Sequence, residues 1–193
     1  MIIGITGGTG CGKTTLLEII QEAGGTVIDC DAVYHRLLHS DTALLQAIAD
    51  RFPGTVVNGK LLRKKLGDIV FRDSAALEDL NQITHAAVRQ EVISMLTPEP
   101  ALAAIDAIGL FESGLSELCK LTVAVNASWQ KRVQRLMARD GIDQEYAMAR
   151  ITSQPSGAEF AARCDHVLVN DDTKEAFREK CLAFLQEQGI ISK

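Results

Sequence analysis

The chain has 193 residues, of which 47% are hydrophobic and 23% charged, and its formal net charge is −5. This length fits one globular domain with room for a small insertion. The acidic balance argues against a nucleic-acid partner that binds a broad basic face, although a local cluster of positive groups can still hold a small anion.

The N-terminus and the cysteines indicate where we expect the protein to work. The apolar start is short and leads directly into a glycine-rich loop, unlike a secretory signal peptide. No apolar run is long enough to span a bilayer. The five cysteines form no C-x-x-C pair and no zinc-ligand spacing. Scattered thiols are typical of a reducing compartment, so we expect a cytoplasmic protein without a membrane partner.

Strand-like and helix-like stretches alternate from the start of the chain. Residues 1–6 are apolar and predict a buried strand. Residues 14–22 have apolar side chains at helical spacing, and the pair Gly24-Gly25 predicts the end of this helix. Residues 26–29 predict a second strand. Further helices are expected through the forties, at 61–71 and from 75 to about 96.

Residues 97–100, Thr-Pro-Glu-Pro, interrupt the pattern before the second half. Residues 101–108 and 121–125 then predict buried strands. Ser128 predicts the N-cap of an arginine-rich helix, because its hydroxyl can accept a hydrogen bond from an unpaired amide. The last strand and helix are expected at 166–169 and 174–188. Strands separated by helices predict an α/β fold with a central parallel sheet and helices on both faces.

Residues 7–14, here called the phosphate loop, match the pattern G-x-x-x-x-G-K-[ST]. Glycines let several backbone amides point at one phosphate chain, and the following helix adds its positive end. Lys13 brings a full charge to the outer phosphates, and Thr14 offers a hydroxyl to Mg²⁺. The strand before and the helix after favour this interpretation over a chance glycine turn. We expect a nucleoside triphosphate with Mg²⁺ to contact Gly8, Thr9, Gly10, Cys11, Gly12, Lys13, Thr14 and Thr15.

A phosphate loop alone does not separate small-molecule kinases from GTPase switches and ATPase motors. A guanine-specific switch would show N-K-x-D after a late strand, whereas 126–129 read N-A-S-W and 170–173 read N-D-D-T. A motor would be longer, with an apolar strand ending in Asp or Asp-Glu. The strand expected at 101–108 instead runs on into G-L-F-E at 109–112. The size of the chain favours a nucleotide-kinase-like enzyme.

The second expected strand ends in Ile-Asp-Cys-Asp at 28–31. Ligands gather at the carboxyl ends of strands in an open parallel sheet. Asp31 is therefore a candidate to orient an acceptor hydroxyl opposite the γ-phosphate and to accept its proton, or to bind Mg²⁺ through water. The alternative is that Asp29 and Asp31 only cap the next helix.

Arginines concentrate in the helix after Ser128. Arg132, Arg135 and Arg139 lie at helical spacing on roughly one face. A kinase needs positive charge over the transferring phosphoryl group and often supplies it from a closing lid. The alternative is a solvated basic face with salt bridges. Arg139 precedes Asp-Gly at the expected helix end, which suits a lid hinge.

The ordered set of motifs resembles the dephospho-coenzyme A kinase family almost end to end. Apart from the phosphate loop, no single piece is specific, and the order of the pieces carries the resemblance. The matching segments are IGITGGTGCGKTT, GGTVIDCDAVYHRLL, GKLLRKKLGDIVF, LNQITHAAVR, GLFESGL, RLMARDGIDQEYAMARITSQ and CDHVLVND.

The resemblance implies a three-layer P-loop NTPase-type fold with a helical acceptor-binding region and a lid. The whole chain, 1–193, would be one kinase domain, with the helical insertion at about 32–97 and the lid at about 139–163. The implied reaction transfers the γ-phosphoryl group of ATP to the ribose 3′-hydroxyl of dephospho-coenzyme A, which would be the small-molecule partner. Such an enzyme is a phosphotransferase with an alcohol acceptor.

Carried over by position, the resemblance also implies roles for single residues. Asp31 would be the base that activates the acceptor hydroxyl. Lys13 and Thr14 would handle the phosphates and Mg²⁺, and Arg139 would be the lid arginine near the phosphates. Asn170 would lie by the adenine of ATP. The acceptor side would include Arg63 and His85.

The sequence departs from the family pattern at several positions. Ala86 follows His85 where the family usually has proline, and residues 108–111 read I-G-L-F where Pro-Leu-Leu is frequent. Arg132 stands where a glutamine is common, and Cys11 replaces a usual serine. None of these changes removes a charged catalytic group. Two alternatives stay open, a nucleoside or nucleotide kinase and a P-loop NTP-binding regulator without a small-molecule acceptor.

Overall fold

The computed structural model describes residues 1–192 and divides the chain into two compact units. The first unit comprises Met1–Ile28, Glu99–Phe111 and the chain from Leu115 onward. The second unit comprises Asp29–Pro98 and Glu112–Gly114. The chain thus leaves the first unit at the end of its second strand and returns within the Thr-Pro-Glu-Pro segment, at Glu99.

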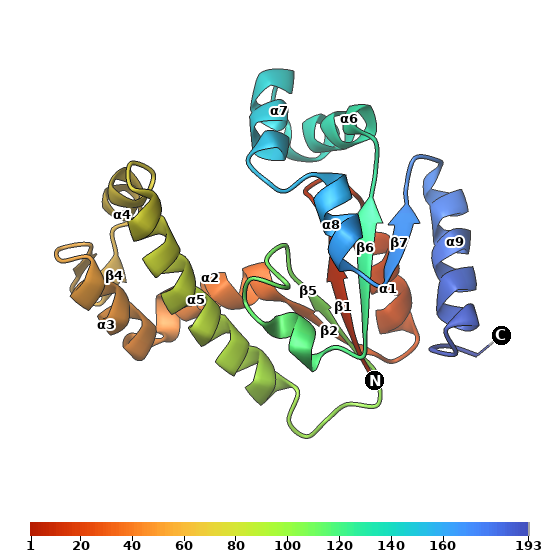
Figure 1. Ribbon diagram of the computed structural model, residues 1–193, viewed down its shortest axis with the longest axis horizontal. Coiled ribbons are helices and arrows are strands. Elements are labelled where there is room, and N and C mark those ends of the chain that lie inside the picture. The colour runs from red at the N-terminus through yellow and green to blue at the C-terminus, as the bar shows by residue number, and fades with distance from the viewer. Residues whose placement is uncertain (193) are drawn as a thin grey trace. The chain divides into compact units, whose positions relative to one another are not determined.

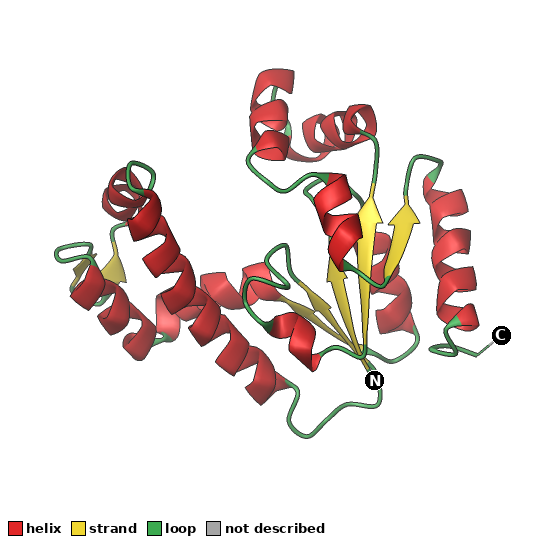
Figure 2. Ribbon diagram, viewed as in Figure 1, coloured by secondary structure: helices red, strands yellow, loops and turns green. Residues whose placement is uncertain are grey.

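The first unit is built on a five-stranded sheet with β1 in the middle (Figures 1 and 2). The strand order is β2-β5-β1-β6-β7, and β1 pairs in parallel with both of its neighbours. The strand bounds are β1 Ile2–Thr6, β2 Thr26–Asp29, β5 Ala103–Asp106, β6 Leu121–Asn126 and β7 His166–Val169. This arrangement brings the phosphate loop, which follows β1, to the centre of one sheet edge.

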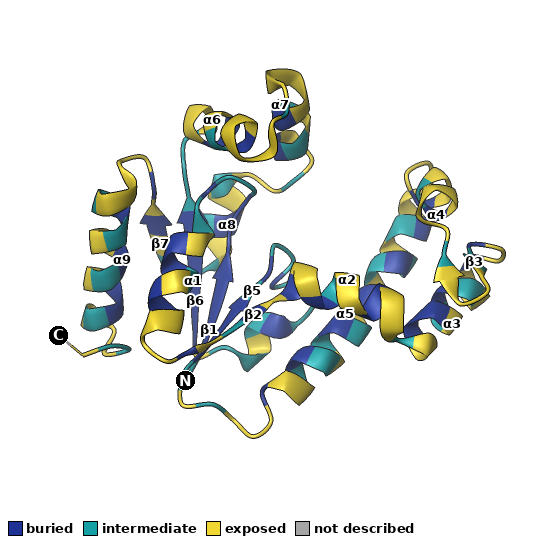
Figure 3. Ribbon diagram, turned by 180° about the vertical axis from the view of Figure 1, so that it is seen from behind, coloured by how far each residue is buried: buried dark blue, intermediate teal, exposed yellow. Residues whose placement is uncertain are grey.

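One face of the sheet packs against α1 (Lys13–Glu22) and α9 (Lys174–Glu187). Alternate strand residues such as Ile3 and Val123 point into this core, because successive side chains of a strand face opposite sides. Figures 1 and 3, seen from opposite sides, show α1 on one side of the strands and α8 (Gly157–Arg163) on the other. The sheet is therefore covered on both faces, as the three-layer fold requires.

The other face is packed closely around β1. Gly4 lies opposite Ile105 and Thr122 in the two neighbouring strands. A Cβ on Gly4 would lie 2.8 Å from Leu110 Cδ2 and 2.9 Å from the Cys119 sulfur. The chain segment with the short helix η1 (Leu115–Leu118) thus fills the space that a side chain at this position would need.

Two further helices of the first unit, α6 (Trp129–Asp140) and α7 (Gln144–Thr152), share a small core of their own. Val133 and Leu136 of α6 pack with Ala147 and Ile151 of α7. Gly141 ends α6 with a φ of 65°, a left-handed conformation that lets the chain reverse direction. The expected lid segment at about 139–163 thus contains the end of α6 and both α7 and α8.

The second unit is helical, with one short hairpin. Its long helix, α5, contacts the other three helices of the unit. Aspartates cap three of the helices, which satisfies amides that the first turn leaves unpaired. The element bounds are α2 Cys30–Ser40, α3 Thr42–Arg51, β3 Val56–Val57, β4 Lys60–Leu61, α4 Arg63–Val70 and α5 Ser74–Met95.

The sequence predictions agree with most of these elements, but they included no separate helices for η1, α7 and α8. They differ from the structure in three further places. The strand expected at 101–108 is shorter and ends at Asp106. Ser128 occupies the N-cap of α6, but its side chain makes no capping hydrogen bond, so that prediction was wrong in its chemistry. The β3–β4 hairpin was missed, because two-residue strands are too short for a period-2 pattern. No helix within residues 1–192 combines the length and apolar character that crossing a membrane requires.

Gly4→Ala tests the close packing around β1. We expect the added methyl group to lower the free energy of unfolding by about 1–3 kcal/mol, because Leu110 and Cys119 already occupy its space. Urea denaturation followed by circular dichroism measures this change.

Gly67→Ala is a control with the opposite expected sign. Gly67 lies inside α4, and its nearest neighbour is the ring of Phe71, which is 83% exposed and free to move away. Alanine should stabilise the helix by about 0.5–1 kcal/mol. A neutral or stabilising Gly4→Ala would contradict the packing described for the sheet.

Candidate active site

The phosphate loop joins β1 to α1 in a conformation that favours glycine. The φ angles of Gly7, Gly10 and Gly12 are 138°, 79° and 90°. A Cβ on Gly7 would lie 2.2 Å from the Val125 carbonyl oxygen, and one on Gly12 would lie 2.2 Å from Asn170 Nδ2. Backbone conformation and close packing therefore both require glycine at these two positions.

The first carbonyls of the loop are bonded within the loop itself. Lys13 Nζ donates a hydrogen bond of 2.9 Å to the Gly7 carbonyl oxygen. The Cys11 amide donates to the Gly8 carbonyl oxygen at 3.2 Å. Lys13 is thus held with its ammonium group across the loop, and its side chain is mostly but not fully buried.

The peptide groups of Thr9 are held from two directions. Arg132 Nε, from α6, donates to the Thr9 carbonyl oxygen at 2.9 Å. The Thr9 amide donates to Gln154 Oε1 at 2.7 Å. Gln154 follows α7, so the segment expected to form the lid contacts the phosphate loop directly.

Asn170 and Arg135 hold the second half of the loop. Asn170 is 5% exposed, and its Nδ2 donates to the Cys11 carbonyl oxygen at 2.9 Å. Arg135 Nη2 donates to both the backbone and the side-chain oxygen of Asn170 at 3.0 Å, and its Nη1 lies 3.4 Å from the Gly10 carbonyl oxygen. The Asn170 amide group is therefore fixed by partners at both of its polar atoms.

These contacts leave the loop with its carbonyl oxygens taken and some of its amides available. Among residues 1–192, the amides of Gly10 and Gly12 donate to no acceptor. Backbone amides that converge in a tight turn before a helix form a site for an anion, and the helix end adds positive potential. The glycine cradle fits a phosphate chain.

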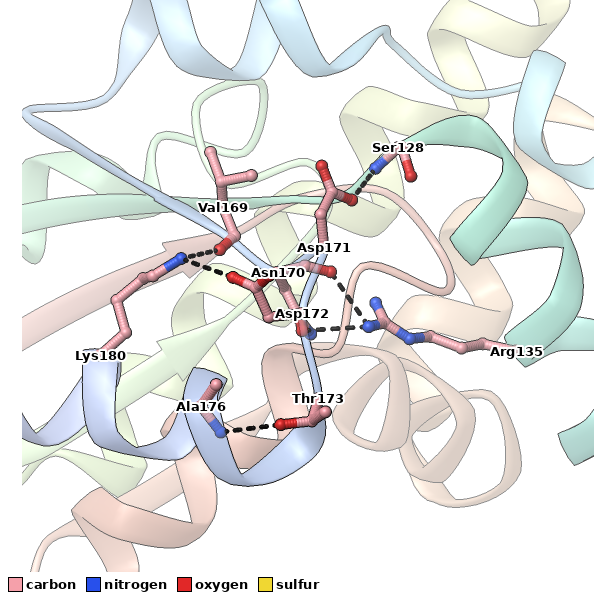
Figure 4. A network of polar contacts seen from close by, with 9 residues as sticks. All are labelled: Ser128, Arg135, Val169, Asn170, Asp171, Asp172, Thr173, Ala176 and Lys180. Carbon is pink, nitrogen blue, oxygen red and sulfur yellow. Dashed lines mark hydrogen bonds and ion pairs between the residues drawn. The ribbon is translucent and has the colours of Figure 1, made fainter.

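The segment after β7 is ordered by its own hydrogen bonds (Figure 4). Asp171 accepts a hydrogen bond of 2.6 Å from the Ser128 backbone amide, and this bond is the main cause that lowers the pKa of Asp171. Lys180 donates to the Val169 carbonyl oxygen at 2.7 Å, and Thr173 caps α9. Residues 170–173 thus form a fixed wall beside the phosphate loop.

A pocket of about 380 Å³ opens between α1, α6 and this wall. Three of its side chains are cationic and one is a carboxylate, so the pocket favours an anionic or strongly polar ligand. The lining residues are Gly12, Thr15, Lys131, Gln134, Arg135, Asn170, Asp172 and Lys174.

Asp106 is a site residue that the sequence reasoning missed. It is the last residue of β5, next to β1, and its Oδ1 lies 3.8 Å from Lys13 Nζ. The sequence pattern predicts a strand that continues to residue 108 and has no terminal aspartate. That was wrong, because β5 does end in an aspartate, so this strand gives no argument against the motor class. The apolar residues 107 and 108 concealed the strand end.

The arginines of α6 have different environments. Arg132 and Arg135 contact the phosphate loop and are not part of a solvated basic face. Arg139 is largely exposed and pairs with Asp140, which also pairs with Arg150 of α7 at 2.6 Å. The hydrogen bond from Arg139 is the main cause that lowers the pKa of Asp140 to about 2. Asp140 thus links the end of α6 to α7.

Asp31, Arg63 and His85 belong to the second unit. Asp31 is exposed in the first turn of α2, whereas Asp29 is the residue that caps this helix through the Ala32 amide. His85 is half-buried in the middle of α5. The roles of these residues toward the phosphate loop stay predictions.

Arg63 begins α4 and lines an open surface recess of about 520 Å³. Its charge partly offsets the effect of burial, which raises the pKa of Tyr34. The recess is lined by Leu61, Leu62, Arg63, Lys64, Lys65 and Asp68.

The family model described as dephospho-CoA kinase matches residues 1–175 of this chain. A dephospho-CoA kinase of Lactobacillus johnsonii is 33% identical, and the match covers 97% of this chain and 98% of that protein. The chain belongs to the dephospho-CoA kinase family.

Two solved structures are similar to the chain in fold and sequence. The crystal structure of TT1252 from Thermus thermophilus has a TM-score of 0.79 and 33% identity, and covers 97% of both chains. The dephospho-CoA kinase from Campylobacter jejuni has a TM-score of 0.67 and 26% identity, and covers 98% of both chains. The predicted P-loop kinase fold and the predicted family are confirmed.

Asp140→Asn tests the ionic link between α6 and α7. Because the folded pKa of about 2 lies below the ordinary value of 3.8, the carboxylate stabilises the fold above pH 4 and this contribution is lost as the pH falls toward 2. We expect the variant to unfold more easily than the wild type at neutral pH and to differ less from it near pH 2.

Thermal unfolding at several pH values measures this difference. The group is exposed, so the effect should be small and should shrink in 1 M salt. A difference between the two proteins that is the same at pH 2 and pH 7 would contradict the ionic interpretation.

Proposed function

We propose that this chain transfers the γ-phosphoryl group of ATP to the ribose 3′-hydroxyl of dephospho-coenzyme A, giving coenzyme A and ADP. The acceptor oxygen attacks phosphorus, the bond to the bridging oxygen of ADP breaks, and the hydroxyl proton leaves to a base. Membership of the dephospho-CoA kinase family supports the reaction and the acceptor.

The observation that carries the proposal is the orientation of the phosphate loop. Its carbonyl oxygens are bonded to Lys13, Arg132, Arg135 and Asn170, while the Gly10 and Gly12 amides are available for a ligand. A loop prepared in this way binds phosphates without first rearranging its backbone, and pre-organisation of that kind lowers the cost of binding.

Thr14 and Asp106 are the residues we propose to hold Mg²⁺. Among residues 1–192 no three His, Cys, Asp or Glu side chains gather as a metal site. The Thr14 hydroxyl and the Asp106 carboxylate suit Mg²⁺, which usually takes one or two protein oxygens and completes its shell with phosphates and water. When bound, Mg²⁺ neutralises charge on the phosphates. Asp106 also holds the Lys13 ammonium group within reach of the loop.

Asp31 is the base in this proposal. A carboxylate in the first turn of α2, directly after the end of β2, suits a group that orients the acceptor hydroxyl and takes its proton. Arg139 is the lid arginine that adds positive charge near the transferred group. Its present partner, Asp140, keeps the guanidinium oriented until a phosphate competes for it.

The adenine of ATP and the acceptor also need binding groups. We propose that the adenine of ATP lies in the pocket bounded by residues 170–174. Asn170 contributes by holding the Cys11 carbonyl oxygen of the phosphate loop in place. On the acceptor side, Arg63 with Lys64 and Lys65 supplies positive charge for the pyrophosphate of dephospho-coenzyme A. His85 is proposed as a further acceptor contact. The five free cysteines support a reducing, cytoplasmic location.

ADP release tests the acceptor. We expect ADP to appear with ATP, Mg²⁺ and dephospho-coenzyme A together, and only traces when the acceptor is omitted. Turnover with a nucleoside or a nucleoside monophosphate instead would indicate a nucleoside or nucleotide kinase. Slow hydrolysis that no acceptor accelerates would indicate an NTP-binding regulator.

Asp31→Asn tests the base. We expect kcat to fall by about 10²-fold or more, the scale of a lost general base, while ATP affinity stays near that of the wild type. Asp29→Asn is the matched control, because asparagine is also a good N-cap and the change removes a carboxylate two residues away. Equal kcat values for Asp31→Asn and the wild type would exclude Asp31 from the mechanism.

A further inference from the structure

Arg132 is a buried cation beside the phosphate loop. The residue is only 6% exposed, although it lies on α6, the helix with the most arginines. Its Nε bonds the Thr9 carbonyl oxygen, which uses one of the five N–H donors of the guanidinium group. Arginine is almost never fully buried without a partner for its charge, so the surroundings of the remaining donors matter.

The Nη2 atom of Arg132 has no such partner. It is buried and makes no hydrogen bond within residues 1–192. No carboxylate of the described chain forms an ion pair with this guanidinium group. A buried donor without an acceptor costs about 1–3 kcal/mol, and more when the group is charged. Within the described residues, no group balances the positive charge at this position.

This charge lies against the backbone of the loop. A Cβ added to Gly8 would be 2.2 Å from Arg132 Nη2, and one added to Gly10 would be 2.9 Å from the Arg132 carbonyl oxygen. The guanidinium group thus occupies the space next to Gly8 that a side chain would otherwise fill. A nucleotide held by the amides of this loop brings several negative charges close to Arg132.

We propose that Arg132 is a positioning residue whose uncompensated charge selects polyphosphate: it fixes the Thr9 peptide and is balanced by the phosphates of the bound nucleotide. Residues 1–192 supply no carboxylate for this purpose, so the ligand supplies the anion. The inference builds on the proposed function, because it requires that the loop bind a nucleoside triphosphate. It concerns a residue that stands where glutamine is common in the family, and so a property of this particular chain.

The charge makes this role distinguishable from simple bracing of Thr9. If Arg132 only held the Thr9 peptide in place, its replacement should destabilise the nucleotide-free protein and weaken the binding of every ligand of the loop alike. If Arg132 acts through its charge, its replacement should leave the nucleotide-free protein as stable as before or more stable. The loss of ligand affinity should then increase with the number of phosphates on the ligand.

The test is isothermal titration calorimetry of ATP, ADP and adenosine with the wild-type chain, Arg132→Gln and Arg132→Lys, together with thermal unfolding of each protein without nucleotide. We expect Arg132→Gln to weaken ATP by about tenfold and adenosine by less than about twofold, because only the phosphates interact with the lost charge. Its melting temperature without nucleotide should equal or exceed that of the wild type. Arg132→Lys keeps the charge and should stay within about threefold of the wild type for ATP.

Arg178→Gln is the matched control, since it removes one arginine charge from α9, where Arg178 pairs with Glu22 at the surface. We expect it to leave ATP affinity unchanged. ATP affinity of Arg132→Gln within about twofold of the wild type, or equal losses for ATP and adenosine, would overturn the inference.

Two further outcomes also bear on the inference. If Arg132→Gln does not fold, Arg132→Lys carries the test: ATP affinity within about threefold of the wild type supports the inference, and a larger loss overturns it. If the wild-type chain itself binds no ATP, the proposed function fails first and the role of Arg132 fails with it.

Discussion

The structure depends on one constraint: a loop that binds phosphate through its amides must have its carbonyl oxygens satisfied from the other side. Carbonyl oxygens left near the ligand would repel it, and buried ones left without donors would cost free energy. Here Lys13 bonds the carbonyl of Gly7, Arg132 that of Thr9, and Asn170 that of Cys11. The amides of Gly10 and Gly12 are thereby left for an anion.

This constraint explains why distant parts of the chain meet at one sheet edge. The parallel sheet places β6 beside β1 and β7 beside β6, so that the helices and loops that follow β6 and β7 lie near the phosphate loop. Helix α6 supplies Arg132 and Arg135, and the segment after β7 supplies Asn170. Through Gln154 the segment after α7 also contacts the Thr9 amide, which links the expected lid to the loop.

Much of this arrangement was readable in the sequence, because local signals agreed. The apolar strand, the glycine pattern and the following helix predicted the loop, and alternating elements predicted the sheet. What failed depended on tertiary contacts. No pattern indicated that Arg132 is buried, since it shares its helical spacing with Arg139, which is exposed, or that Asp106 ends β5, since apolar residues follow it. The Ser128 hydroxyl does not cap α6 as predicted. Instead, the Ser128 backbone amide donates a hydrogen bond to the side chain of Asp171, 43 residues away.

A crystal structure with Mg²⁺ and a non-hydrolysable ATP analogue tests the central claim most directly. The account predicts density for a triphosphate within hydrogen-bond distance of the Gly10 and Gly12 amides, while the backbone of the phosphate loop keeps the positive φ angles of its glycines and the side-chain bonds to its carbonyls. A loop that turns its carbonyl oxygens toward the ligand, or a nucleotide bound elsewhere with the loop empty, would contradict it.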